Sequence, residues 1–155
     1  MGMGKNCPMC RAKTPTSDEE KVNYLRPWVK KKKAWAMAMM GQHYHRGEGV
    51  KQSYEMARRL YEQAAQQGDV NAIYNLGDMY RKGLGVELSY EKAFEYYEQA
   101  AHLGYVKAQY NLGVLYYNGD GMEQNIAKAK EWLTKAKAQG YEAATQALKV
   151  IHMDN

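Results

Sequence analysis

The sequence predicts an all-α protein in which pairs of helices stack into a solenoid. The chain repeats itself every 36 residues: segments 33–68 and 69–104 are identical at 16 of 36 positions, and 69–104 and 105–140 at 15. Apolar residues within each unit fall at helical spacing, as Ala72, Leu76 and Tyr80 do. Nothing in units 33–140 alternates with the period of a β-strand. Three stacked pairs can bury a continuous core that one pair cannot.

Composition places the chain among soluble single-domain proteins. It has 155 residues, of which 45% are apolar and 25% charged. No apolar run approaches the roughly 18 residues that span a bilayer, and the N-terminus lacks the apolar core of a signal peptide. Residues 1–33 hold nine Lys/Arg against three acids, whereas 34–155 hold thirteen against fourteen, so the basic character belongs to the head. We expect a cytoplasmic protein, with the nucleus as the alternative.

The chain before the repeats is expected to form a head and a capping helix. Residues 1–16 are predicted to be disordered, unless they are the zinc-finger remnant discussed below. Segment 17–32 resembles the second helix of a repeat, with Ser17 as N-cap, Glu20 completing a capping box and lysines in the last turn. Pro27 should kink or end this helix near Arg26. The segment would cap the first repeat.

Each repeat is predicted to contain two antiparallel helices. In the second unit, helix A spans about 70–82 and ends at a G-x-G turn, and helix B spans about 89–103 after the N-cap Ser89. Ser53 and Asn125 occupy the same position in the other units. The repeats are thus 33–68, 69–104 and 105–140, and 141–155 forms a C-terminal capping helix and tail.

A glycine recurs in the middle of every helix A, at Gly41, Gly77 and Gly113. Glycine inside a helix costs on the order of 1 kcal/mol relative to alanine. Its repetition indicates that a neighbouring helix needs the space of the missing Cβ.

These columns resemble the Sel1-like repeat, a relative of the tetratricopeptide repeat. The order A-x-x-x-L-G-x-x-Y-x-x-G-x-G-V, then K-A, aromatic residues, A-A and a closing Gly, runs over 33–140. The departures are Met40 for Leu, Met122 for Val and Lys137 for the second Ala. The resemblance implies a right-handed α-α superhelix whose A helices line the concave face. Secreted members of the family carry cysteines within the repeats, and their absence here favours a reducing compartment.

The segment Cys7-Pro8-Met9-Cys10-Arg11 resembles the closing CPxCR of a RING finger. Its C-x-x-C spacing lets two thiolates meet one zinc ion, but a RING site needs eight ligands and the chain has two cysteines. The segment is therefore the tail of a longer RING protein, a divergent remnant or a chance match. We predict no metal site, with Cys7 and Cys10 as ligands only if a complete finger exists upstream.

Three other patterns have structural explanations. His43 and His45 are two residues apart on a helix, so their side chains point about 200° apart and cannot easily share an ion. The turns GEGV, GLGV and GDGM lack the strand and the GK[ST] of a phosphate-binding loop. The run Lys30–Lys33 either forms an import or anion-binding patch or ends a helix favourably. No nucleophile, base and oxyanion arrangement is visible, so we expect neither enzymatic activity nor a cofactor.

The predicted functional site is the groove lined by the A helices. Rings, amides and cations together suit a protein or peptide segment, with rings supplying area and Asn or Arg fixing its backbone or an acidic group. The alternative for Tyr74 and Tyr110 is packing between helices. We expect a non-catalytic adaptor or scaffold with no small-molecule substrate, membrane insertion or nucleic-acid partner; the alternative is the substrate-binding part of a RING-type ubiquitin ligase. The candidate residues are Trp35, Gln42, His45, Arg46, Asn71, Tyr74, Asn75, Asp78, Arg81, Lys82, Lys107, Tyr110, Asn111, Val114, Tyr117 and Asn118.

Overall fold

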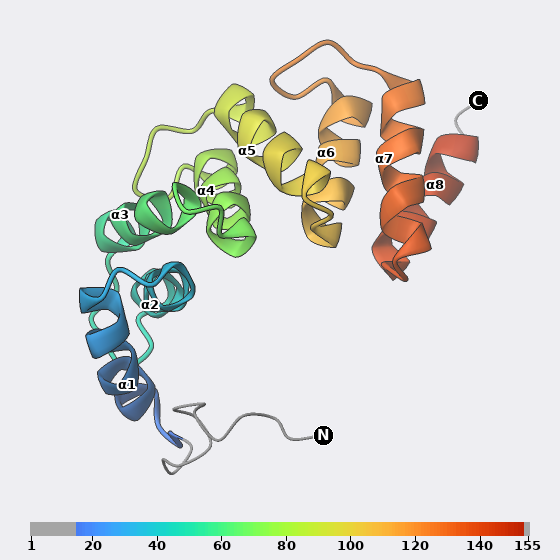
Figure 1. The fold of residues 1–155 in the computed structure, drawn as a ribbon. Coiled ribbons are helices and arrows are strands. Elements are labelled where there is room, and N and C mark those ends of the chain that lie inside the picture. The colour runs from blue at the N-terminus through green and yellow to red at the C-terminus, as the bar shows by residue number, and fades with distance from the viewer. Residues whose placement is uncertain (1–14, 154–155) are drawn as a thin grey trace, which may run out of the picture.

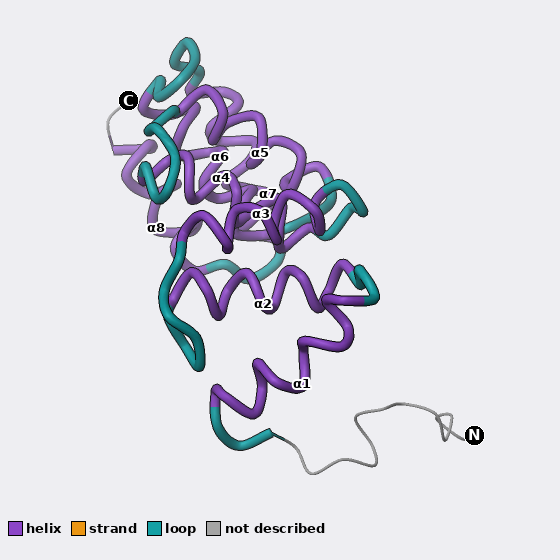
Figure 2. Tube along the Cα trace, turned by 90° about the vertical axis from the view of Figure 1, so that its left-hand side faces the viewer, coloured by secondary structure: helices purple, strands orange, loops and turns teal. Residues whose placement is uncertain are grey.

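The computed structural model describes residues 15–153, which form eight α-helices joined by short loops, without strands in that range (Figures 1 and 2). The helices follow one another along an arc, with α2 and α4 on its inner side (Figure 1). Their bounds are α1 Asp18–Lys30, α2 Ala34–Arg46, α3 Tyr54–Ala65, α4 Val70–Lys82, α5 Tyr90–His102, α6 Val106–Asn118, α7 Ile126–Ala138 and α8 Glu142–Met153. This is the predicted all-α solenoid.

Local sequence signals start and end the helices of the repeats. The N-cap side chains Ser53, Ser89 and Asn125 each accept a hydrogen bond from a backbone N–H in the first turn of helices α3, α5 and α7. Helices α2, α4 and α6 each end at a glycine in the left-handed conformation, Gly47, Gly83 and Gly119. The turn chemistry therefore repeats with the sequence period.

Helix α1 forms with its expected capping box, in which the Ser17 hydroxyl accepts from the Glu20 N–H. Of the two outcomes expected from Pro27, a kink or an end near Arg26, the end is wrong, because the helix continues to Lys30. Trp28 and Val29, beyond the proline, are half-buried against the core of the first repeat, and the Pro27 carbonyl still accepts from the Lys31 N–H at 3.1 Å. Packing and these later hydrogen bonds offset the donor that proline lacks.

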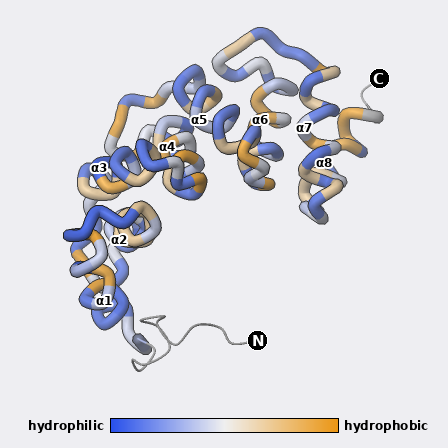
Figure 3. The backbone as a smooth tube through the Cα atoms, in the orientation of Figure 1, coloured by the Kyte–Doolittle hydropathy of each residue, from blue (hydrophilic) through white to orange (hydrophobic). Residues whose placement is uncertain are grey.

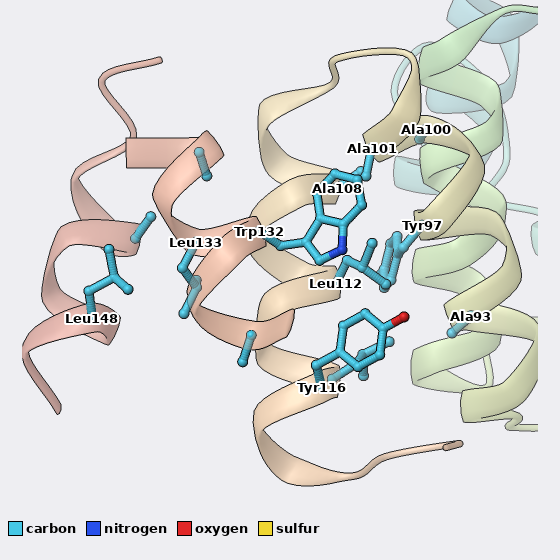
Figure 4. Close-up of a cluster of buried hydrophobic side chains, with 14 of the residues drawn as sticks. Ala93, Tyr97, Ala100, Ala101, Ala108, Leu112, Tyr116, Trp132, Leu133 and Leu148 are labelled. Carbon is cyan, nitrogen blue, oxygen red and sulfur yellow. The ribbon is translucent and has the colours of Figure 1, made fainter. Parts of the chain in front are cut away.

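The core comprises two buried clusters, one built from α1 to α4 and the other from α4 to α8. In the second cluster Tyr97, Leu112, Tyr116 and Trp132 come together between α5, α6 and α7 (Figure 4). Every helix carries both hydrophobic and hydrophilic residues along its length, as amphipathic layers require (Figure 3).

The mid-helix glycines make room for helix B of their own repeat. A Cβ at Gly41, Gly77 or Gly113 would lie 2.6, 2.8 or 2.7 Å from the nearest side-chain atom of Tyr61, Tyr97 or Leu133, respectively. All three of these side chains are at most 1% exposed. The prediction that a neighbouring helix needs the space is confirmed.

Candidate protein-binding groove

The sixteen predicted groove residues all lie on α2, α4 and α6, and none of them is buried. Their exposure follows from the sequence period, because they alternate with buried columns such as Ala72, Leu76 and Met79. Six are exposed: Trp35, Arg46, Asn71, Lys82, Lys107 and Asn118. Ten are half-buried: Gln42, His45, Tyr74, Asn75, Asp78, Arg81, Tyr110, Asn111, Val114 and Tyr117.

Asp78 is the centre of a polar network on α4. Its carboxylate accepts from Lys82 Nζ at 2.7 Å and from an Arg81 guanidinium nitrogen at 2.9 Å. The Tyr97 hydroxyl, from α5, donates to Asp78 at 3.3 Å and accepts from Arg81 Nε at 3.1 Å. These bonds fix the direction of Arg81.

The network also sets the charge of Asp78. Burial raises the pKa of its carboxyl, but the hydrogen bonds from Lys82 and Arg81 outweigh burial and hold the pKa below its ordinary value. Asp78 is thus ionised at neutral pH and the two cations remain charged beside it.

Tyr74 acts mainly as a link between repeats. Its ring lies 5.6 Å from the Tyr97 ring and 4.9 Å from the Tyr105 ring, and its hydroxyl accepts from Asn111 Nδ2 at 3.4 Å. Burial raises the pKa of Tyr74 to about 12. Tyr110 similarly lies 5.2 Å from Tyr141. Both rings thus contact rings outside their own helices while each tyrosine stays half-buried rather than buried.

One hollow of about 470 Å³ brings predicted residues of two repeats together. Arg81 from α4 lines it with Tyr110, Asn111, Val114 and Asn118 from α6. Sequence reasoning missed the other lining residues, Tyr90, Leu115 and Asp120. Tyr90 is the first residue of helix α5, and Asp120 lies in the G-x-G turn that follows α6. This turn packs on the start of α5, which brings both residues to the wall of the hollow.

A second, apolar hollow of about 210 Å³ extends from α6 to the C-terminal helices. Val114 and Tyr117 line it together with Leu133 and, from α8, Ala147, Val150 and Ile151. Val114 belongs to both hollows, so they adjoin along α6.

The predicted residues of the first repeat are less closely grouped. The Trp35 ring lies 5.8 Å from Trp28 of α1, and the His45 ring packs edge-on against Tyr54 at 5.3 Å. His45 Nδ1 is buried and has no hydrogen-bond partner among the described residues, and burial lowers the pKa of His45. This imidazole is neutral at physiological pH.

The candidate groove has an excess of positive charge. Its charged members are Arg46, Arg81, Lys82, Lys107 and a single carboxylate, Asp78. Arg46 makes only a long contact of 3.8 Å with Glu48, and Lys107 forms no ion pair within residues 15–153.

The two histidines discussed in the sequence have different surroundings. The imidazole of His43 is buried and approaches the Glu48 carbonyl, whereas His45 packs on tyrosines. The Cys7–Arg11 segment lies outside the described residues. Within the described range no helix is both long and apolar enough to cross a membrane.

The family model for the Sel1 repeat matches residues 36–69, 70–105 and 106–141, and the chain belongs to the Sel1-repeat family. This fold is typical of protein–protein interaction scaffolds and is generally non-catalytic. No curated protein matches the sequence.

Solved structures share the solenoid. The chain is similar to c5321, a protective antigen of uropathogenic Escherichia coli strains with an SLR fold: identity is 32% and the TM-score 0.78, over 83% of this chain and 27% of that one. The chain is also similar to a Sel1 repeat protein from Oxalobacter formigenes, with 31% identity and a TM-score of 0.78. This match covers 82% of this chain and 51% of that one. The match to Helicobacter pylori cysteine rich protein B has 20% identity and a TM-score of 0.66, over 86% of this chain and 99% of that one. At this identity the match shows the fold alone. The chain thus spans about a quarter of the length of c5321 and about half of the length of the Oxalobacter formigenes protein.

Proposed function

We propose that the protein is a non-catalytic scaffold that binds an acidic protein segment in the groove lined by α2, α4 and α6. The observation that carries this proposal is the hollow between α4 and α6, where Arg81 faces polar and aromatic side chains of the next repeat. Arg81 is held in place by Asp78 and Tyr97, so binding does not have to order it. We place this activity in the cytoplasm, because the repeats contain no cysteine.

The division of work among the side chains follows from their contacts. The exposed cations Arg46 and Lys107 attract the segment, and the rings and amides around Arg81 contact it at close range. Tyr74 holds the two repeats in register rather than contributing contact area. The alternative role in a RING-type ubiquitin ligase depends on Cys7–Arg11 alone and gains no support from the repeats.

The test is selection of binders from a displayed random peptide library, followed by affinity measurement on the selected peptides. We expect peptides rich in Asp and Glu, with affinity that falls as salt rises. Arg46→Gln with Lys107→Gln should weaken binding about fivefold, at roughly 0.5 kcal/mol for each exposed charge. Neither change disturbs the Asp78 network.

The matched control is Lys51→Gln with Lys149→Gln, which removes the same charge from exposed positions outside the groove. It should leave the affinity unchanged. Equal weakening by both pairs would show that binding follows net charge alone, and selection of basic or charge-free peptides would refute the acidic-segment proposal.

A further inference from the structure

The solenoid contains three equivalent junctions between a G-x-G turn and the start of the preceding helix B. In each, the second glycine of the turn packs so closely that a Cβ would come within 2.5 Å of the opposite residue. The pairs are Gly49 with Asp18, Gly85 with Tyr54, and Gly121 with Tyr90. The start of helix α1 therefore packs against the turn of the first repeat in the same way that the starts of α3 and α5 pack against the turns of the second and third repeats.

The first junction differs from the others in its chemistry. Asp18 takes the position of Tyr54 and Tyr90. His43 takes the position of Met79 and Leu115, which are 0% and 2% exposed. Glu48 takes the position of Leu84 and Asp120. Among the three junctions, this one alone combines an imidazole with two carboxylates.

The three side chains also converge. One potential ligand atom of Asp18, one of His43 and one of Glu48 all lie within 4.8 Å of one another. His43 is only 7% exposed, and its Nδ1 lies 2.9 Å from the Glu48 carbonyl oxygen. Because a carbonyl only accepts, Nδ1 is the donor in this contact, and Nε2 is the ring nitrogen left to bind a metal. A hydrogen bond of this kind orients histidine ligands in metal sites.

We propose that Asp18, His43 and Glu48 bind one divalent transition-metal ion of the zinc class, which fastens the capping helix α1 to the first repeat. Imidazole selects such ions over Mg²⁺ and Ca²⁺, and three protein ligands leave a position for water. In a tetrahedral site, zinc ligands about 2.0–2.2 Å from the metal lie about 3.3–3.6 Å apart, so side-chain movements of roughly 1 Å close the site.

Two exposed cations compete with the metal for these carboxylates. Lys21 Nζ lies 2.8 Å from Asp18, and an Arg46 guanidinium nitrogen lies 3.8 Å from Glu48. All four of these side chains are more than 40% exposed, so both ion pairs are weak and a bound divalent ion displaces them.

The experiment uses the full chain with Cys7→Ser and Cys10→Ser, which removes the thiols as rival ligands. ZnCl₂ is titrated against the melting temperature, and CoCl₂ is followed through its visible d–d absorption. We expect a one-to-one site, an increase in Tm of about 5 °C at 100 times the dissociation constant, and reversal by a chelator.

The matched variant is His43→Met, which installs the residue that the second repeat uses at the same position and preserves an apolar fit. Glu48→Gln, at a loop position, serves if His43→Met does not fold. Either folded variant should lose at least tenfold in affinity for Zn²⁺ and the cobalt spectrum. An unchanged affinity in the variant, or no Tm increase and no cobalt band in the parent, would overturn the proposal.

Discussion

Gly77 shows how strictly packing constrains a single residue of an A helix. A Cβ there would lie 2.8 Å from ring carbons of Tyr97, which is 0% exposed and cannot swing aside. The sequence alone predicted that a neighbouring helix packs closely here, because glycine, which destabilises a helix, recurs at the same position in all three repeats. It was not sufficient to name the partner, because helix B offers several aromatic residues.

We predict that Gly77→Ala destabilises the protein even though alanine favours the helix. The helical gain is about 1 kcal/mol, whereas overpacking a core typically costs 1–3 kcal/mol and here requires the Tyr97 ring to move. We expect a net loss of roughly 1 kcal/mol in the free energy of unfolding, measured by urea denaturation. Glu95→Ala, at an exposed helix position, is the control and should change little; a more stable Gly77→Ala would contradict the packing argument.

Asp78 gives a prediction that depends on pH. We expect Asp78→Asn to lower stability at pH 7 by about 1 kcal/mol, because two charge-assisted hydrogen bonds are lost and their partners are partly exposed. The folded-state pKa of Asp78 is lowered, so its contribution is complete above the unfolded pKa of about 3.9 and disappears as pH falls through the folded value. Thermal unfolding at pH 7 and near pH 2 should show the parent and variant converging. A gap of equal size at both pH values would show that the effect is not electrostatic.

At the scale of the element, the sequence period fixed helix positions closely and tertiary packing decided the exceptions. Helix A of the second repeat was expected at about 70–82 and lies at Val70–Lys82, and helix B was expected at about 89–103 and lies at Tyr90–His102. Helix α1 is the exception, since it runs past Pro27. Local helix propensity does not include tertiary packing, so it could not predict that Trp28 and Val29 become partly buried when the helix continues.

We predict that Pro27→Ala stabilises α1, because the proline is exposed and supplies no hydrogen bond to the turn before it. Alanine gains about 3 kcal/mol of helix propensity and gives back up to about 1 kcal/mol through the freer unfolded chain, so the net gain is about 2 kcal/mol. Hydrogen exchange of the α1 amides should slow, while α7 amides serve as the internal reference. Faster exchange in α1 would show that the proline stabilises the native turn.

At the scale of the whole molecule, the solenoid and its surface columns follow from the repeat, but the contacts between columns do not. The sixteen candidate residues were predicted to lie outside the buried stripe, and none is buried. The sequence did not reveal that Tyr97, nineteen residues beyond Asp78, reaches back to bind it, nor that Tyr90 and Asp120 complete the hollow around Arg81. These contacts depend on the angle between helices, which a linear pattern does not contain.

The arc of helices has a mechanical consequence. Apart from a small contact between α2 and α4, the substantial helix–helix contacts within residues 15–153 join consecutive helices. Within the described part of the chain, no substantial contact joins α1 to α8 across the open side of the arc (Figure 1). Because small changes in angle at successive junctions add up, the distance between the two ends of the arc depends on every junction in the series. A ligand that contacts both ends of the arc would therefore restrict the curvature of the whole solenoid.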